Sequence, residues 1–296
     1  MAATDSVAVK RSAGRRFAGL FYGRPRLQIG SLLAAPMAWL VILYLGSLVI
    51  LLITAFWTVD PLSGSVIKEL SWTNFEELVN VPVYREIIWR TVRTALLVTL
   101  TDAVIAFPIA FYMAKVAGRK SKAALVVAVL MPLWASYLVK IIAWRAILAE
   151  HGVLNWALHP IGLHGPDNGV TSVWLVMSYL WLPYMILPIF AGLERIPDSL
   201  IAASEDLGAH PFTTFRKVIL PLAFPAVVAG SIFTFSLTLG DYLAPKLVSN
   251  EQFIGTAIFD SITNNQPFAA ALALVPIVVV IAYLGVARKL GAFEHV

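Results

Sequence analysis

PDSLIAASEDLGAHPFTTFRKVILP, at residues 197–221, is a polar stretch between two apolar segments, and it decides the fold. Asp198 or Ser199 can cap a helix after Pro197, because a short polar side chain accepts hydrogen bonds from the free N–H groups of the first turn. Gly208 ends that helix, since glycine reaches left-handed backbone angles without steric cost. The helix has three apolar residues on one face at helical spacing: Leu200, Ala203 and Leu207.

The second half of this stretch predicts another short helix. Pro211 suits a first helical turn, where its missing N–H would be unpaired anyway. Phe212 and Phe215 give this helix an apolar contact before a long apolar run begins near Val218. Two short helices that meet at a glycine can occupy a groove of another protein, whereas an ordinary connection has about four to six residues. The stretch therefore favours docking to a cytoplasmic partner, and an interfacial hairpin is the alternative.

The composition of the whole chain indicates a membrane protein. Of its 296 residues, 59% are hydrophobic and 13% are charged, whereas soluble domains have about 25% charged residues. The chain has no cysteine, which excludes disulfides and thiol-ligated metals. The spacing of His151, His159 and His164 in one loop suits no common metal site. We therefore expect no metal, no cofactor and no catalytic residue.

Six apolar segments are long enough to cross a bilayer, which takes about 20 mostly apolar residues. The third of them continues to Ala149, past Lys140 and Arg145. Because lipid offers no water to backbone groups, such continuous runs are expected to be helices. The sequence predicts an all-α membrane protein with six transmembrane helices, at residues 27–59, 94–114, 123–139, 168–193, 218–240 and 261–287.

The Lys and Arg residues predict the orientation. Of the 22 cations, 15 lie in the N-terminal segment, the 115–122 and 194–217 loops and the C-terminal segment, and 7 lie elsewhere. Since cytoplasmic loops have the excess of Lys and Arg, both termini are predicted to be cytoplasmic. This distribution also explains the net charge of +5 without a nucleic-acid partner. The exterior loop at 60–93 contains an expected amphipathic helix at 72–78, either a surface for an extracytoplasmic partner or an interfacial anchor.

The segment AASEDLGA, at residues 202–209, resembles the EAA loop of ABC-importer permeases. In that family the loop forms the coupling helix that inserts into the ATPase subunit. Ala202 stands where the family usually has Glu, and Ser204 stands where it usually has a second Ala. The matching positions of the coupling loop are Ala203, Asp206, Gly208, Ala209, Phe215, Leu220 and Pro221.

Residues 107–115, 131–144 and 240–248 resemble spermidine/putrescine permeases of the PotB/PotH type. This resemblance covers roughly residues 30–290. It implies a type I ABC-importer permease (MetI-like) fold, with a coupling loop at 194–221. Residues 1–29 would then be a basic cytoplasmic N-terminal segment, and residues 291–296 a cytoplasmic tail.

The resemblance also implies function and partners. The chain would be a permease of the bacterial inner membrane, working by alternating access with a cytoplasmic ABC ATPase dimer, a second permease subunit and an extracytoplasmic solute-binding protein. Hydrolysis belongs to another chain, because no G-x-x-x-x-G-K-[ST] occurs here. A polyamine is the expected solute; phosphonate, iron, thiamine or sulfate are alternatives. A stand-alone secondary transporter is a further alternative, but it predicts an ion-coupling pair or an inverted repeat.

Acids and aromatic residues near the spans are candidates for the substrate path. Polar groups inside spans cost about 2.5–3.5 kcal/mol on insertion scales, so they suggest function. Carboxylates and aromatic walls would attract a polycation. The candidates are Asp102, Asp241, Tyr242, Trp134 and Tyr137, with Trp181 and Tyr184 as further walls. Alternatively, Asp102 pairs with Arg93 or a partner permease, Asp241 marks the water boundary, and the aromatic residues form interfacial belts.

Overall fold

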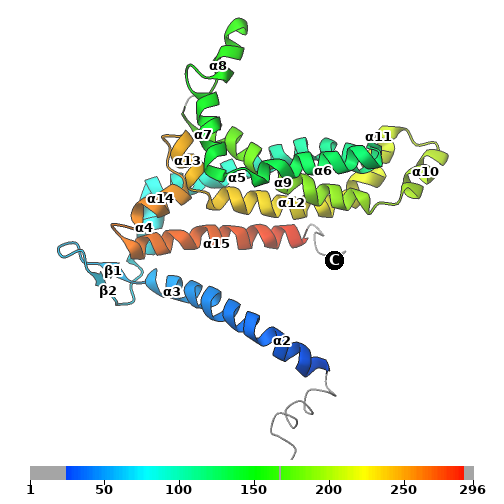
Figure 1. The fold of residues 1–296 in the computed structure, drawn as a ribbon. Coiled ribbons are helices and arrows are strands. Elements are labelled where there is room, and N and C mark those ends of the chain that lie inside the picture. Colours follow the sequence, from blue (N-terminus) through cyan, green and yellow to red (C-terminus); the bar gives the residue numbers. More distant parts are fainter. Residues whose placement is uncertain (1–24, 167, 290–296) are drawn as a thin grey trace, which may run out of the picture. The chain divides into compact units, whose positions relative to one another are not determined.

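The computed structural model describes residues 25–166 and 168–289, most of them in helices (Figure 1). The chain divides into two compact units, residues 1–53 and 54–296. Most of the expected basic segment at 1–29 and all of the tail at 291–296 lie outside the described residues. The division into an N-terminal segment, a permease domain and a tail therefore stays a prediction.

The first unit is built on one apolar helix. It consists of α2 (Pro25–Trp39), the π-helical turn η1 (Leu40–Leu45) and most of α3 (Gly46–Thr54). The stretch Leu32–Thr54 is long and apolar enough to cross a membrane, and only 6% of its most apolar window is buried. Such a helix exposes large apolar side chains nearly all round, which suits contact with lipid or with another chain.

A hairpin and a short helix open the second unit. Strand β1 (Thr58–Val59) pairs antiparallel with β2 (Val66–Ile67), so the first span ends before Val59, its expected limit. Helix α4 (Thr73–Asn80) is the amphipathic helix expected at 72–78. The buried amide of Asn74 donates to the Ala55 and Trp57 carbonyl oxygens, at 2.8 and 2.7 Å. These bonds fix α4 against the chain that follows α3.

The second span begins earlier than expected. Helix α5 (Pro82–Phe111) and the π-helical turn η2 (Tyr112–Val116) form one 35-residue stretch. Residues 82–93, which were expected to be a loop, are therefore helical, and their exterior location stays a prediction. Pro82 suits the first turn of a helix, and the charge of Arg90 is paired with Glu86 at 2.7 Å and with Glu251.

The third apolar segment is not one straight span. Helix α6 (Arg119–Trp134) ends at residues 135–136, which have extended backbone, and α7 (Tyr137–Leu148) follows. The helical stretches on the two sides of this break are bent by 91°. Pro132 lies in the last turn of α6, where it removes a backbone donor and favours a helix end. The single span expected at 123–139 must be corrected to this bent pair.

The predicted second short helix at Pro211 is not separate from the fifth span. Pro211–Gly240 is one 30-residue stretch, so Pro211 begins the fifth span itself.

The remaining elements form the bundle and its two ends. They are α8 (Val153–Leu158), η3 (His159–Ile161), α9 (Val170–Glu194), α10 (Asp198–Asp206), α11 (Pro211–Thr214), η4 (Phe215–Ile219), α12 (Leu220–Gly240), α13 (Leu243–Val248), α14 (Ile254–Ser261) and α15 (Gln266–Lys289).

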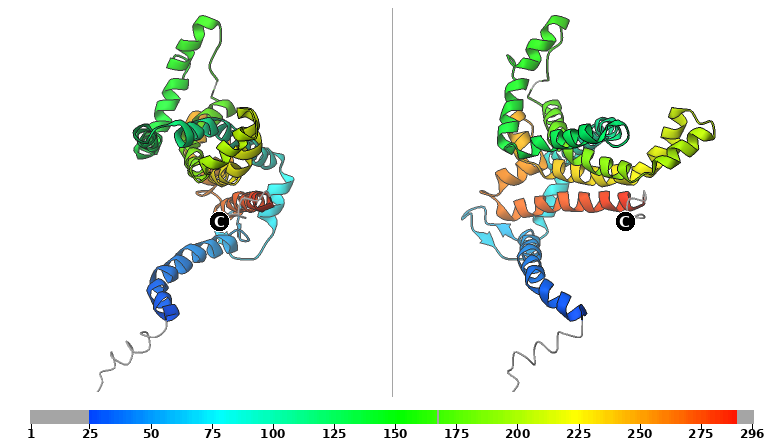
Figure 2. Two further views of the ribbon diagram at one scale, coloured as in Figure 1. Left: turned by 90° about the vertical axis from the view of Figure 1, so that its right-hand side faces the viewer. Right: turned by 45° about the vertical axis from the view of Figure 1, so that its right-hand side comes forward.

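Helix α9 lies at the centre of the second unit, packed on α5 and α12 (Figure 2). Half of its most apolar window is buried. One core cluster surrounds Met177 and Leu180 near its start, and another surrounds Met185 and Ile189 near its end. A Cβ at Gly192 of α9 would overlap the Cβ of Ala226 on α12. The two helices therefore approach closely because one of them has no side chain there.

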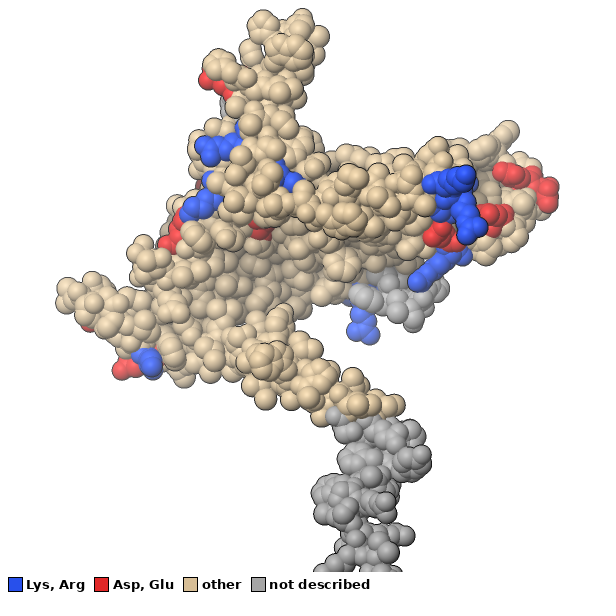
Figure 3. Space-filling view, in the orientation of Figure 1, with Lys and Arg blue, Asp and Glu red and all other residues tan. Residues whose placement is uncertain are grey.

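Charge marks the two ends of this bundle. On the face shown in Figure 3, the acidic and basic side chains of residues 54–289 gather near α10 at one end and near α7 and α13 at the other. The band between them is uncharged, as a bilayer requires. Within the described residues, five helices can cross a membrane, or six if the bent pair α6–α7 counts as one span. The cytoplasmic location of both termini stays a prediction.

The Gly192→Val variant tests the close packing of α9 on α12. We expect the free energy of unfolding to fall by about 1–3 kcal/mol, the usual cost of overpacking, and to appear as a lower Tm in detergent. Gly285→Val in α15 is the control, because a Cβ there meets nothing within 4 Å. Equal melting temperatures for the two variants would contradict the packing described here.

Candidate functional site

Helix α10 ends as its sequence predicts. Gly208 has φ +79°, in the left-handed region. Its N–H donates to the Glu205 carbonyl at 2.8 Å, and the Ala209 N–H donates to the Ser204 carbonyl at 3.1 Å. These bonds satisfy carbonyl groups that the end of a helix leaves free. The turn at Gly208 therefore reverses the chain from α10 towards α11.

The start of α10 differs from the expectation. Pro197 is the N-cap and no side chain caps the helix, so the capping predicted for Asp198 or Ser199 is wrong. The Asp198 carboxylate instead accepts a hydrogen bond from Lys115 Nζ at 2.7 Å. The Lys115 ammonium holds the pKa of the Asp198 carboxyl below its usual value. This ion pair therefore persists into mildly acidic solution.

One face of α10 contacts its own chain and the other is open. Ile201 is half-buried against the core cluster around Met185, and the Ser204 hydroxyl lies 3.0 Å from the Thr214 hydroxyl. The predicted apolar face is exposed, and Leu207 at its tip has 88% of its surface accessible. The residues of that face are Leu200, Ala203 and Leu207. Figures 1 and 2 show α10 and α11 projecting past the end of the bundle.

The other positions predicted for the coupling loop divide into an exposed set and a partly buried set. Asp206 and Gly208 are exposed at the tip, and Pro221 is exposed on α12. Phe215 packs its ring edge-on against Phe107 of α5, with the centroids 5.5 Å apart. Ala209, Phe215 and Leu220 are partly buried and join the loop to the bundle.

Asp102 is fully buried between helices, with 0% of its surface exposed. Among the described residues, its two carboxyl oxygens have no hydrogen-bond partner, and no ion pair links it to Arg93. The Ser178 hydroxyl of α9 faces this carboxyl but lies outside hydrogen-bond geometry. A buried polar group without a partner is costly, so Asp102 is an exception that packing alone does not explain.

Asp241, in contrast, has several partners. Its carboxylate accepts hydrogen bonds from the Tyr137 hydroxyl and from the backbone N–H groups of Leu243 and Ala244, at 2.9 and 3.4 Å for the last two. The side chain therefore caps the start of α13 and joins it to α7. These contacts give Asp241 a structural role at the corner after α12.

The structure brings some of the aromatic candidates together. The Tyr137 ring stacks on Trp181 at 5.9 Å, and Trp181 contacts Tyr184 edge-on at 5.9 Å. Tyr242 stacks instead on Phe259, at 4.9 Å. Trp134 is 81% exposed and, among the described residues, belongs to no ring pair with these aromatic side chains. The predicted set therefore separates into the Tyr137–Asp241 corner, the buried Asp102 and the exposed Trp134.

Sequence reasoning missed a polar cluster on the far side of the bundle from α10. Arg90 on α5 pairs with Glu86 and Glu251, and its guanidinium donates to the Gln252 carbonyl at 3.2 Å. The Thr91 hydroxyl accepts a hydrogen bond from the Ile254 N–H at 3.0 Å. The only sequence signal was the group of arginines at 85–93, whose partners lie far along the chain. These bonds attach the start of α5 to the segment before α14.

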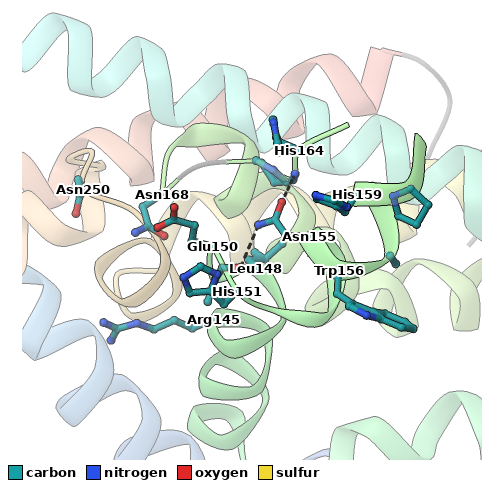
Figure 4. Close-up of a pocket in the computed structure, with 15 residues that line it drawn as sticks. Arg145, Leu148, Glu150, His151, Asn155, Trp156, His159, His164, Asn168 and Asn250 are labelled. Atoms are coloured by element: carbon teal, nitrogen blue, oxygen red, sulfur yellow. Dashed lines mark hydrogen bonds between the residues drawn. The ribbon is translucent and has the colours of Figure 1, made fainter. Parts of the chain in front are cut away.

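A polar cavity of about 1540 Å³ lies beside α7 and α8 (Figure 4). His151, His159 and His164 all line it. The Asn155 amide donates to the Ala149 carbonyl at 3.0 Å, and its oxygen accepts from the Gly165 N–H. Within the described residues, no group of three His, Asp or Glu side chains lies close enough to hold a metal. Asn155, in α8, thus joins the end of α7 to the segment before α9.

A family model matches two thirds of the chain. Residues 96–290 match the family described as "Binding-protein-dependent transport system inner membrane component". The chain belongs to this family. The permease is therefore a multi-pass protein of the bacterial inner membrane, and a non-catalytic membrane subunit of an ABC importer for a small solute.

Two relatives cover most of the permease. It is 45% identical over 297 residues to "Inner membrane ABC transporter permease protein YdcU" of Escherichia coli (strain K12), covering 94% of this chain and 95% of that one. It is 29% identical over 245 residues to "Spermidine/putrescine transport system permease protein PotB" of Haemophilus influenzae, covering 80% and 85%.

Solved structures share the fold of the permease. A chain of the bacterial alginate ABC transporter, bound to its pentasaccharide-loaded periplasmic protein, aligns with a TM-score of 0.68 at 14% identity, covering 92% of this chain and 95% of that one. A chain of the inward-facing MetNI methionine ABC transporter aligns with a TM-score of 0.57 at 16% identity, covering 72% and 97%. These alignments confirm the predicted MetI-like fold.

The Tyr137→Phe variant tests the corner at Asp241. Removing the hydroxyl takes one donor from a half-buried carboxylate, so the free energy of unfolding should fall by about 1.5–3 kcal/mol. Thermal unfolding in detergent measures this change. Tyr184→Phe is the control, because its ring keeps the Trp181 contact. If Tyr137→Phe has the same Tm as the control and the unmodified permease, the hydrogen bond does not stabilise this corner.

Proposed function

We propose that the permease forms the membrane path of a polyamine importer, and that a cytoplasmic ABC ATPase drives it through α10. The observation that carries this proposal is the open apolar face of α10. It stands at the end of the bundle, and the contacts of α10 with the permease itself that are described above lie elsewhere on the helix, at Asp198, Ile201 and Ser204. An exposed apolar helix face at such a position is suited to a groove on another protein.

The coupling loop at 194–221 supplies this contact. Leu207 and Ala203 enter the groove, Asp206 lies at its rim, and Gly208 sets the turn. Phe215 and Leu220 connect the loop to α5 and α12. Ala202 is exposed in place of the Glu that the EAA pattern usually has, so apolar contact contributes more of the docking than an ion pair at that position.

The arrangement of the helices supports a shared cytoplasmic side for α10 and the end of α15. Helix α15 ends on the same side of the second unit as α10 (Figure 1), so a cytoplasmic α10 places the end of α15 in the cytoplasm as well. The complete importer then contains two ATPase subunits, a second permease subunit (a copy of this chain or a paralogue) and an extracytoplasmic solute-binding protein. Residues 30–290 act as the permease domain between cytoplasmic segments 1–29 and 291–296.

Polyamine is the proposed solute for two reasons. The PotB relatives are named for spermidine and putrescine, and Asp102 offers a carboxyl with free acceptor atoms inside a span. Attraction between a carboxylate and an ammonium is strong where water is excluded. Because Asp102 is fully buried here, it meets the solute only in a conformation that opens the contact of α5 with α9. Asp241, Tyr242, Trp134 and Tyr137 line the path outside this point.

The Gly208→Val variant tests the coupling loop. A Cβ at Gly208 meets nothing within 4 Å, so the change strains only the backbone, at φ +79°. Left-handed backbone costs a non-glycine residue about 1–2 kcal/mol, and we expect ATP-driven putrescine uptake to fall about tenfold at unchanged membrane levels.

The matched control is Gly118→Val, at another open position but with φ −66°. Uptake in proteoliposomes and copurification of the ATPase are measured together. Normal uptake in Gly208→Val would count heavily against a coupling role for this loop.

The Asp102→Asn variant tests the solute path. It keeps the shape of the side chain but removes its charge, so the KM for putrescine should rise about tenfold, equivalent to about 1.4 kcal/mol, with assembly unchanged. Unaltered uptake kinetics would remove Asp102 from the path. If the unmodified importer ignores putrescine and spermidine but takes up phosphonate, iron, thiamine or sulfate, the polyamine assignment fails and the importer assignment stands.

A further inference from the structure

Two ion pairs flank the connector between α9 and α10, residues 195–197. Glu194, the last residue of α9, pairs with Lys122 at 2.8 Å, and Asp198, the first residue of α10, pairs with Lys115 at 2.7 Å. Lys115 lies in η2, directly after α5, and Lys122 lies in the first turn of α6. We refer to these four residues as the connector bracket. It joins the end of α5 and the start of α6 to the end of α9 and the start of α10. These segments are distant in sequence and meet where α10 leaves the bundle.

Lys115 is the buried member of the bracket. Its side chain is 9% exposed, whereas that of Asp198 is 87% exposed. Its ammonium also donates to the Ile196 carbonyl at 2.6 Å. A cation is favourable beside the free carbonyl groups at the end of a helix. Ile196 itself is buried in the core cluster around Met185. Lys115 therefore binds the backbone of the connector as well as a side chain.

The backbone around Lys115 is adapted to this contact. Lys115 lies in the π-helical turn η2, which the Ala117 N–H closes on the Tyr112 carbonyl at 2.8 Å. A π-helical turn contains an extra residue, so it changes the direction of the side chains in it, and such turns are frequent at functional sites. Lys122 also reaches this turn, with its Nζ 3.4 Å from the Ala114 carbonyl oxygen.

The tip of α10 is held differently from its base. The Ser204 hydroxyl lies 3.0 Å from that of Thr214, while Leu207 and Gly208 are exposed. A displacement of the exposed tip of α10 reaches the bundle only if the base of α10 stays fixed to the bundle. A mobile base would absorb the displacement in the connector.

We propose that Lys115 is a positioning residue that ties the base of α10 to the end of α5, so that a displacement of α10 is transmitted to α5. This inference rests on the proposed function of α10. An ion pair that is exposed at both members contributes little to stability, and the Lys122–Glu194 pair is 30% and 42% exposed. The Lys115 side chain, in contrast, is 9% exposed and also donates to the Ile196 carbonyl. Lys115 therefore holds the base, and Lys122 adds only a minor contact.

The first test measures the distance between α10 and α6 without any solute. The chain has no cysteine, so spin labels at Ala203→Cys and Lys120→Cys in the full-length permease report one distance in nanodiscs. We expect a single narrow distribution, which Lys115→Met broadens and Lys115→Arg restores. Lys122→Met is the matched control and should leave the width nearly unchanged. Equal widths for Lys115→Met and Lys122→Met overturn the proposal.

The second test measures transport in the importer with its ATPase. Putrescine imported per ATP hydrolysed should fall about fivefold in Lys115→Met, at the lower end of coupling between sites, while the ATPase still copurifies. Unchanged uptake per ATP in that variant overturns the proposal. Failure of the ATPase to copurify with the unmodified permease contradicts the proposed function instead, and the distance measurement then decides the role of Lys115 alone.

A variant on the exposed side of the bracket guards against a folding defect. If Lys115→Met does not accumulate in the membrane, Asp198→Asn removes the ion pair and leaves the contact of Lys115 with Ile196. Partial broadening of the distance distribution in Asp198→Asn supports the proposal, and an unchanged distribution overturns it.

Discussion

The close approach of α9 to α12 is the contact on which the rest of the second unit depends. Lipid tails are as apolar as leucine, so helices in a bilayer associate through close packing rather than by escaping water. Gly192 permits contact with Ala226, and Gly230 lies where a Cβ would stand 2.8 Å from the Met185 sulfur. With α5 packed on the same helix, α9 connects the core cluster at one end to that at the other. Its position fixes where α10 begins.

The two ends of this bundle are held by polar contacts of different kinds. At one end, Arg90 joins α5 to the segment before α14, and Tyr137 joins α7 to the corner at Asp241. At the other end, the connector bracket joins α5 and α6 to the base of α10. Asp102 lies in α5 between these ends. A motion that reaches α5 through Lys115 would therefore act on the helix that contains the unpartnered carboxyl.

The sequence predicts those features that depend on neighbouring residues. Helix α9 begins and ends within two residues of its expected limits, because an uninterrupted apolar run lies between polar loops. Gly208 is recognisable because glycine reaches its left-handed φ without steric cost. The start of α5 was missed since Arg90 finds acceptors about 160 residues away, at Glu251 and Gln252. The bend at 135–136 was missed because the apolar pattern runs through it. The partner of Asp198 lies 83 positions earlier, beyond any local pattern.

The late arrival of α9 has a consequence for how the protein is made. Asp102 of α5 is buried in the finished fold, where Ser178 of α9 faces it, and α9 begins only at Val170. At ordinary rates of synthesis this helix follows several seconds later. During that interval the newly inserted hairpin of α5 and α6 presents an acid to lipid or to the insertion machinery.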